Sequence, residues 1–309
     1  MTRPATAGAT AGTTLAPRRR HAGRTVLREL PLLPAFILLA AFMLGPIVYA
    51  LYGSLTNRTM SGYRAAAPEF VGLDNYVNLL TDPNFLKSVL LTTLFLFASA
   101  IVGQNVLGMF VAVLMRHCPK PVASVVGATI VGAWVMPEIV AAFACYAFFS
   151  SEGTLNSILA AVGLTGPKWL LTFPMLSVIL ANIWRGTAFS MMNYNAALAE
   201  VPPEVKESAQ IDGANAVQTF FRISLPMIRR TVATNLMLTT LQTLGVFTLI
   251  WVMTGGGPGT DSATLPVLAY QEAFKFSQVG YGTAIATVTL VVGAIFSTVY
   301  MRVLKPEVD

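Results

Sequence analysis

The sequence predicts an all-α membrane protein with about six transmembrane helices and one long polar segment between two of them. Three observations predict this fold class. The 309 residues are 55% hydrophobic and only 11% charged, whereas soluble domains carry roughly 25% charged residues. Long uncharged apolar runs recur along the chain, as a multi-spanning protein requires. One polar stretch, 202–226, interrupts the otherwise apolar second half.

The N-terminal region divides into a polar tail and a first apolar run. Residues 1–29 are rich in Ala, Thr and Gly and then in Arg, which is typical of a disordered basic cytoplasmic tail. The first predicted span covers Leu30 to Leu55. A basic stretch before an apolar run also resembles a secretory signal, with Val48-Tyr49-Ala50 as a cleavage site. The run is longer than a usual signal core and more spans follow, so we favour a retained helix.

Five further apolar runs predict the remaining spans, with polar turns and loops between them. The third contains Pro137-Glu138, the fourth contains Arg185, and a short charged tail at 306–309 follows the sixth. The five runs are Ser88–Met115, Val122–Phe149, Leu170–Ala199, Thr231–Met253 and Phe276–Tyr300.

The distribution of positive charge predicts the orientation. If the N-terminus lies inside, most of the 20 Lys and Arg residues fall in segments on the inner side. Loops on the cytoplasmic side of membrane proteins carry such an excess. We therefore expect both termini and the polar stretch 202–226 to be cytoplasmic.

The polar stretch has the pattern of a helix, a turn and a second short helix. Pro202 and Pro203 suit a first helical turn, where the missing N–H costs nothing. Asp212-Gly213 is a turn signal that ends this helix. Acidic residues occupy the first helix, where they complement the helix dipole, and apolar residues mark the second. These are Glu204 and Glu207, then Phe220, Phe221, Ile223 and Leu225, and the segment stops at Pro226.

These residues carry a resemblance. The series Glu207-Ser208-Ala209, Gly213, Ile223 and Leu225-Pro226 resembles the EAA loop of permease subunits in binding-protein-dependent ABC importers. Ser208 stands where the family pattern has Ala. The runs Phe70–Tyr76 and Thr254–Gly259 resemble external loops of the sugar-type permeases, the maltose/glycerol-phosphate type. A cytoplasmic connector without a docking role is the alternative for the polar stretch.

The resemblance implies a permease subunit of an ATP-driven importer of a carbohydrate, a sugar, oligosaccharide or polyol-like solute. It implies a transmembrane domain over 30–305 with a cytoplasmic EAA-type coupling loop at 200–230, in the cytoplasmic (inner) membrane. The docking surface for the ATPase would be shaped by Glu204, Glu207, Ser208, Ala209, Asp212, Gly213, Ile223, Leu225 and Pro226.

The same resemblance implies the partners. These are a second permease subunit forming a heterodimer, two cytoplasmic ATPase subunits and an extracytoplasmic solute-binding protein, all within or against membrane lipid. ATP and Mg²⁺ would bind the ATPase subunits, and we expect no cofactor on this chain.

No enzyme site emerges from the residues. The glycine run 255–259 lacks the Gly-Lys-Ser/Thr that a phosphate-binding loop requires. Two histidines, His21 and His117, do not give zinc-site spacing. We therefore expect neither catalytic residues nor a metal site, and the net charge of +6 follows from membrane topology rather than from nucleic-acid binding.

Two charged residues, Glu138 and Arg185, are predicted near the middle of the third and fourth spans. Facing lipid there would cost about 2.5 kcal/mol or more for each. They are expected either to pair with each other, as a structural ion pair, or to place Arg185 on the solute path. An ion-coupled secondary transporter using the Glu138/Arg185 pair is the rival function. The ATPase-docking loop and the lack of a visible inverted repeat argue against it.

Neutral polar residues within the spans are the other candidates for the solute path. A hydroxyl-rich solute exchanges its hydrogen bonds with water for bonds to such groups. Asn182, one turn before Arg185, and Gln242 are the two preferred candidates. Hydrogen bonding between helices explains these residues equally well.

Overall fold

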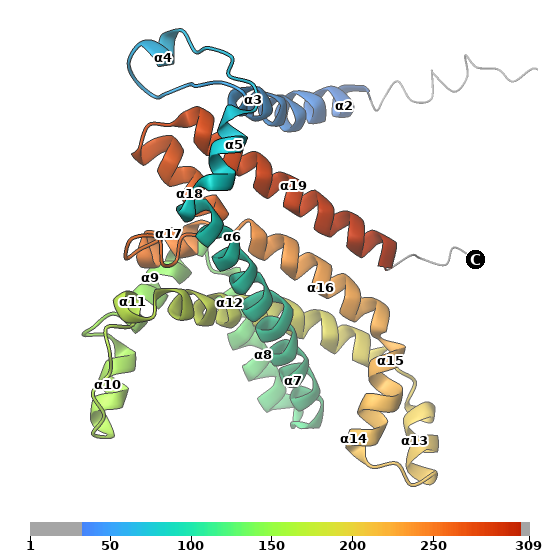
Figure 1. Cartoon of the computed structure of the whole chain (residues 1–309). Coiled ribbons are helices and arrows are strands. Elements are labelled where there is room, and N and C mark those ends of the chain that lie inside the picture. The colour runs from blue at the N-terminus through green and yellow to red at the C-terminus, as the bar shows by residue number, and fades with distance from the viewer. Residues whose placement is uncertain (1–32, 304–309) are drawn as a thin grey trace, which may run out of the picture. The chain divides into compact units, whose positions relative to one another are not determined.

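The computed structural model describes residues 33–303, so the tails predicted at 1–29 and 306–309 lie outside the described residues. Within this range the chain is helical, and its only β feature is an isolated antiparallel bridge between Thr56 and Phe70. The all-α fold class is confirmed (Figure 1). The α-helices are α2 Leu33–Leu39, α3 Gly45–Ser54, α4 Tyr63–Ala66, α5 Asp74–Thr81, α6 Pro83–Phe95, α7 Asn105–His117, α8 Lys120–Val135, α9 Glu138–Phe149, α10 Thr154–Ala161, α11 Trp169–Thr172, α12 Pro174–Ala199, α13 Pro203–Ile211, α14 Ala216–Thr219, α15 Leu225–Met227, α16 Arg229–Leu244, α17 Thr248–Thr254, α18 Leu265–Tyr270 and α19 Val279–Val303. Four π-helical segments connect some of them: η2 Ala40–Leu44, η3 Leu96–Gln104, η4 Phe220–Ser224 and η5 Gln271–Lys275.

The chain forms two compact units, Met1–Tyr49 and Ala50–Asp309. The described part of the first unit is a continuous helical stretch made of α2, η2 and the start of α3. Together with the end of α3 it gives the candidate span Leu33–Ser54, in agreement with the first predicted span. Its side chains are apolar and exposed, as in Phe42.

Within residues 33–303, three helices are long and apolar enough to cross a membrane, and there are up to five spans if each of two bent pairs is one span. The unbent ones are Leu33–Ser54, Pro83–His117 and Val279–Arg302. The 26-residue helix α12 is not among them, although ~39 Å of helix would cross a bilayer. Its window includes Arg185 and several polar side chains.

The third and fifth predicted spans are not continuous helices. Helix α8 and the stretch Glu138–Ala161, which contains α9 and α10, are bent by 106°, and α16 and α17 are bent by 49°. The first bend follows from Pro137, because the residue before a proline is driven out of the helical region and proline lacks a donor. Met136 and Pro137 both have ψ near 137° (138° and 137°). The second bend contains Gly245 and Phe247.

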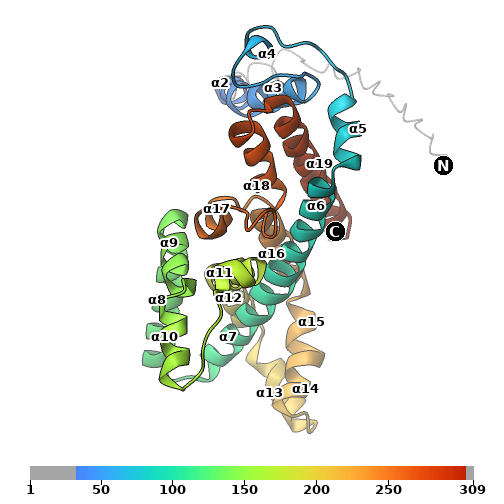
Figure 2. The same ribbon diagram turned by 60° about the vertical axis from the view of Figure 1, so that its left-hand side comes forward.

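Helix α12 is the central element of the second unit. It packs against η3, α7, α8, α9, α16 and α17, and Figure 2 shows α8, α9 and α10 together on one side of it. Its close approach to α7 depends on Gly108, where an added Cβ would lie 2.5 Å from Ser190 Cβ. Gly186 likewise leaves room for the Gln104 side chain. These small residues permit tight helix packing in a membrane, where no hydrophobic force drives helices together.

Candidate functional site

The polar stretch forms a helical module, which we call the coupling segment, Pro203–Met227. Helix α13 begins with Pro203 and ends before a turn in which Gly213 has φ = 84°. Helix α14 begins with a capping box, in which Asn215 and Gln218 exchange side-chain to backbone hydrogen bonds. The predicted helix–turn–helix is confirmed, with its end at Met227 rather than at Pro226.

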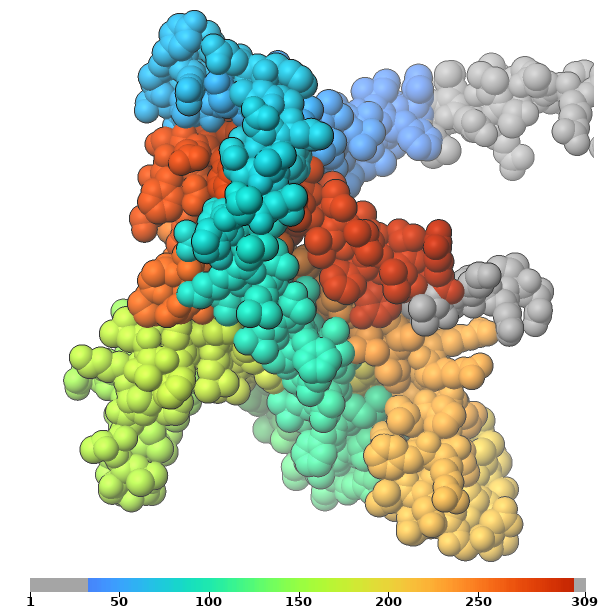
Figure 3. Space-filling view, viewed as in Figure 1, coloured from blue at the N-terminus to red at the C-terminus, as the bar shows by residue number. Residues whose placement is uncertain are grey.

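The coupling segment has one face packed on the bundle and one face exposed. Phe220 and Leu225 pack against a cluster from α7 and α12 that includes Met191 and Tyr194. Ile211, beside the turn between α13 and α14, is 86% exposed. Figure 3 shows the segment, in yellow to light orange, projecting beyond its neighbours. An exposed apolar tip on a polar helix pair is typical of a surface that a partner protein covers.

The predicted docking residues lie on this module as follows. Ala209 is buried, and the hydroxyl of Ser208 donates to the Glu204 carbonyl oxygen at 2.9 Å. The space around Gly213 is open, because nothing lies within 4 Å of an added Cβ there. The remaining members are exposed or half-buried: Glu204, Glu207, Asp212, Ile223, Leu225 and Pro226.

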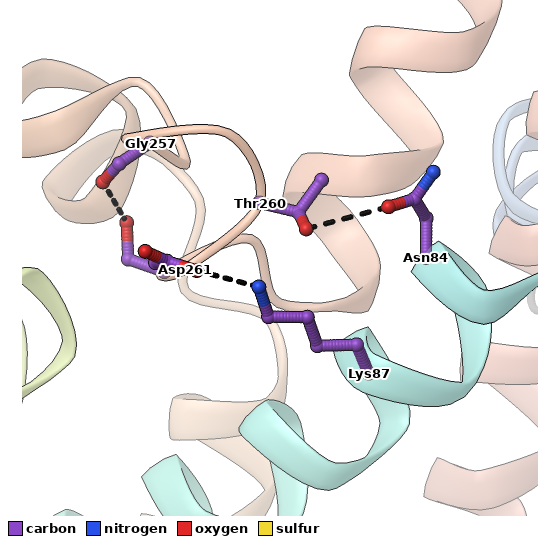
Figure 4. A network of polar contacts seen from close by, with 6 residues as sticks. Asn84, Lys87, Gly257, Thr260 and Asp261 are labelled. Atoms are coloured by element: carbon purple, nitrogen blue, oxygen red, sulfur yellow. Dashed lines mark hydrogen bonds and ion pairs between the residues drawn. The ribbon is translucent and has the colours of Figure 1, made fainter.

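At the far end of α6 from the coupling segment, the start of α6 contacts the loop 255–264 and helix α19. Lys87 forms an ion pair with Asp261 at 2.5 Å, and Thr260 donates to Asn84 at 3.4 Å (Figure 4). The Tyr281 hydroxyl donates to Asp82 at 2.7 Å. Pro83–His117 is one helical stretch of 35 residues. Its first end contacts the loop 255–264, and its last end contacts the α12–α13 region.

A buried polar network joins α7, α12 and α16 between these ends. Asn235 donates to Asn105 Oδ1 at 2.8 Å and to Ser190 Oγ at 2.9 Å, and its amide also reaches the Tyr194 hydroxyl. The Tyr194 hydroxyl in turn donates to Asn105 Oδ1. Asn193 donates to Asn235 Oδ1 at 2.7 Å. Each of these hydrogen bonds joins side chains of two different helices, so the network fixes the positions of the helices relative to one another.

Glu138 and Arg185 do not form the predicted pair. Lys87 pairs with Asp261, whereas no ion pair joins Glu138 to Arg185 among the described residues. Glu138 lies at the first residue of α9 and not in the middle of a span, because Pro137 breaks the helix there. Its carboxylate lies at the start of α9 and also at the start of α17, where the Leu249 N–H donates to Glu138 Oε1 at 3.4 Å. Helix N-termini stabilise a negative charge, which removes the need for Arg185 as a partner.

Arg185 lies near the middle of α12 with its Nε atom buried and without a hydrogen-bond partner. A buried guanidinium group is stable only when polar groups surround it. The described residues supply no hydrogen-bond acceptor to Arg185 Nε.

The two neutral candidates differ in their surroundings. Asn182 is 4% exposed, and its amide donates to Ser99 Oγ at 2.8 Å and to Thr243 Oγ1 at 3.4 Å. Its side chain therefore joins α12 to η3 and α16 in this structure. Gln242 is exposed on α16, close to the bend before α17.

Sequence reasoning missed an aromatic cluster beside that bend. The rings of Phe247 and Trp251 stack with their centroids 5.7 Å apart. The ring centroid of Tyr270 lies 4.8 Å from that of Trp251 and 5.0 Å from that of Phe274. The signal was present as two aromatic pairs with four-residue spacing, Phe247/Trp251 and Tyr270/Phe274, which lie on one helix face each. Within residues 33–303 no group of three His, Cys, Asp or Glu side chains is placed to hold a metal ion.

Taken together, bent spans, a buried polar network and an exposed helical module at one end define a polytopic membrane transport component. Residues 104–309 match the family described as binding-protein-dependent transport system inner membrane component, and the chain belongs to this family.

Curated relatives agree with this assignment over nearly their full length. The trehalose/maltose transport system permease protein MalF of Thermococcus litoralis is 30% identical, over 90% of this chain and 93% of its own. The multiple sugar-binding transport system permease protein MsmF of Streptococcus mutans is 31% identical, over 89% and 93%. The sulfoquinovosyl glycerol transport system permease protein SmoG of Agrobacterium fabrum is 29% identical, over 92% of each chain.

A solved structure shares the fold. A chain of a bacterial ABC transporter that imports the acidic polysaccharide alginate superposes with a TM-score of 0.78 at 22% identity, covering 93% of this chain and 98% of that one. The family match identifies the chain as an inner-membrane component of a transport system, and its candidate spans make it multi-pass.

Proposed function

We propose that this chain is one permease subunit of an ATP-driven importer that takes up a carbohydrate delivered by an extracytoplasmic binding protein. The coupling segment is the observation that carries the proposal, because it projects an exposed apolar tip at one end of the unit. The names of the relatives, which transport trehalose, maltose, other sugars or a sugar glycerol conjugate, support the solute class.

The proposed complex contains a second, different permease, two ATPase subunits and the binding protein. The chain has no Gly-x-x-x-x-Gly-Lys-Ser/Thr sequence, so ATP and Mg²⁺ belong on the ATPase subunits. Closure of the ATPase pair would move the coupling segment as a rigid body and switch the bundle between outward- and inward-open states. Both termini and the coupling segment lie in the cytoplasm in this proposal.

Arg185 and Gln242 are our candidates for the solute path. Arg185 has an unpartnered buried Nε atom, and Gln242 is an exposed amide beside the bend of α16 and α17. Broken helices in transporters commonly line binding sites at mid-membrane. A guanidinium and an amide are suited to the oxygen atoms of a polyhydroxylated solute.

Purification of the tagged chain from solubilised membranes, with mass spectrometry of what accompanies it, tests the proposal. We expect an ATPase, a second permease and a binding protein, with sugar uptake that depends on ATP in reconstituted vesicles. Recovery of the chain alone, with uptake driven by a proton or sodium gradient, would refute it.

A further inference from the structure

A groove of about 570 Å³ lies between the end of α7 and the coupling segment. One wall is apolar and comes from the membrane-spanning part of α7 and from η4, with Phe110 and Phe221 each 61% exposed. A second part of the groove is basic and is lined by Arg116, Lys206 and His117. Phe110 and Arg116 are ~9 Å apart along the helix axis. The groove therefore changes from apolar to cationic over about the depth of a lipid headgroup region.

The cations of the groove have no acidic counterparts. No Asp or Glu is among its lining residues, and neither Arg116 nor Lys206 forms an ion pair with the part of the chain that the structure describes. Arg116 Nη1 donates to the Asn195 carbonyl oxygen at 3.3 Å, and His117 Nδ1 contacts the Val113 carbonyl oxygen at 2.9 Å. Burial, and then the charge of Arg116, lower the pKa of Lys206. An exposed Arg116 and a half-buried Lys206 thus present two like charges to one groove.

We propose that this groove binds an anionic phospholipid, with the phosphate between Arg116 and Lys206 and an acyl chain along Phe110 and Phe221. Arg and Lys bind phosphate oxygens with charge-assisted hydrogen bonds. Basic pockets between helices at the cytoplasmic face are the known mode for acidic headgroups. A free phosphate would satisfy the cations but would leave the apolar wall in water, which favours a lipid as the occupant.

The lipid would connect a transmembrane helix to the coupling segment. Arg116 lies in the last turn of α7, and Lys206 lies on α13, so one phosphate bound by both restrains α13 against the bundle. This regulatory consequence rests on the proposed function, because α13 matters for uptake only if an ATPase docks on it. Binding of the lipid itself does not depend on that role.

Lipid retention measures the site directly. The full chain, in the complex with which it co-purifies, is exchanged into detergent with equal amounts of palmitoyl-oleoyl phosphatidylglycerol and phosphatidylcholine, and bound lipid is counted by native mass spectrometry. We expect the wild type to retain phosphatidylglycerol selectively. The double variant Arg116→Gln/Lys206→Gln should retain it roughly tenfold or more weakly, while Arg116→Lys/Lys206→Arg retains it.

The matched control is Arg229→Gln/Arg230→Gln. It removes the same charge from two exposed residues at the start of α16 that do not line the groove. The proposal is overturned if both double variants lose phosphatidylglycerol equally, if the two lipids are retained equally, or if inorganic phosphate displaces phosphatidylglycerol. An unchanged lipid count with loss of the ATPase from the groove variant would also overturn it, since the groove would then be a protein contact.

Discussion

Gly213 has the backbone conformation that decides whether α13 and α14 can lie side by side. Its φ of 84° is in the left-handed region, which costs an ordinary L residue roughly 1–2 kcal/mol. An added Cβ would touch nothing within 4 Å, so the penalty is conformational and local rather than steric. The turn can therefore be damaged without disturbing the bundle.

We expect Gly213→Val to abolish transport and transport-stimulated ATPase activity while the protein inserts normally. Gly213→Asn is the matched control, because Asn tolerates the left-handed region, and it should keep most of the activity. Stimulated ATPase and uptake in vesicles measure the effect, and membrane fractionation measures insertion. Normal stimulated ATPase in the valine variant would show that the turn does not shape a docking surface.

Glu272, in η5, makes the stability of the protein depend on pH. Burial, and then the neighbouring Asp82 carboxylate, raise the pKa of Glu272. The protonated form is therefore favoured by the folded state. The stability that protonated Glu272 contributes to the folded state is complete below the unfolded-state pKa of about 4.3. It is lost as the pH rises through the higher folded-state pKa, because the folded protein then holds more protons than the unfolded one.

We therefore expect Glu272→Gln to raise the thermal unfolding temperature near pH 7.5, with the gain shrinking toward zero near pH 4. Asp82→Asn serves as a contrast, because Asp82 also accepts from Asn84 N–H at 2.8 Å and from the Tyr281 hydroxyl. That variant should unfold at a lower temperature across the range. A gain for Glu272→Gln that does not vary with pH would contradict the electrostatic explanation.

At the scale of elements, the sequence predicted which segments are helical better than it predicted where they break. The six apolar runs correspond to helices, because hydrophobic length is a strong signal in membrane proteins. The bend at Pro137 was also readable, since the residue before a proline is restricted. Treating Val122–Phe149 as one span placed Glu138 at mid-helix instead of at a helix start, and the supposed pair with Arg185 followed from that placement.

The candidate site was predictable only in part, for a physical reason. The coupling segment is local in sequence, so turn chemistry and spacing define it. The buried network, the aromatic cluster and the basic groove each combine residues far apart in the chain, as with Asn105 and Asn235. Which face of a helix meets which neighbour depends on packing, and no single segment encodes that.

The network of α7, α12 and α16 gives an element-scale prediction. Asn235→Leu removes an amide nitrogen that lies within hydrogen-bond distance of Asn105 Oδ1, Ser190 Oγ and the Tyr194 hydroxyl, and it leaves these buried oxygen atoms with fewer partners. The expected loss is about 1–3 kcal/mol, measured as resistance to unfolding in detergent. Thr298→Val is the control, because the exposed Thr298 hydroxyl donates only within its own helix. Equal stability of both variants would mean that the network does not hold the helices together.

At the scale of the whole molecule, the two functional ends are separated by one helical stretch. Pro83–His117 has 35 residues, or ~52 Å of helix, which exceeds the ~30 Å hydrocarbon core of a bilayer. Its first end meets the loop that contains Asp261, and its last end meets the basic groove beside the coupling segment. The excess of Lys and Arg expected on the coupling-segment side favours the cytoplasmic position that we propose for it.

This orientation predicts the accessibility of single cysteines in intact cells. In a background with Cys118→Ala and Cys145→Ala, a membrane-impermeant maleimide should label Lys275→Cys but not Ile211→Cys until the membrane is opened. Both native residues are exposed on the protein surface, so a difference in labelling reports the side of the membrane and not burial. Labelling of Ile211→Cys from outside would place the coupling segment away from any cytoplasmic ATPase. The importer mechanism requires the opposite result, because ATP is available to the motor only on the inner side.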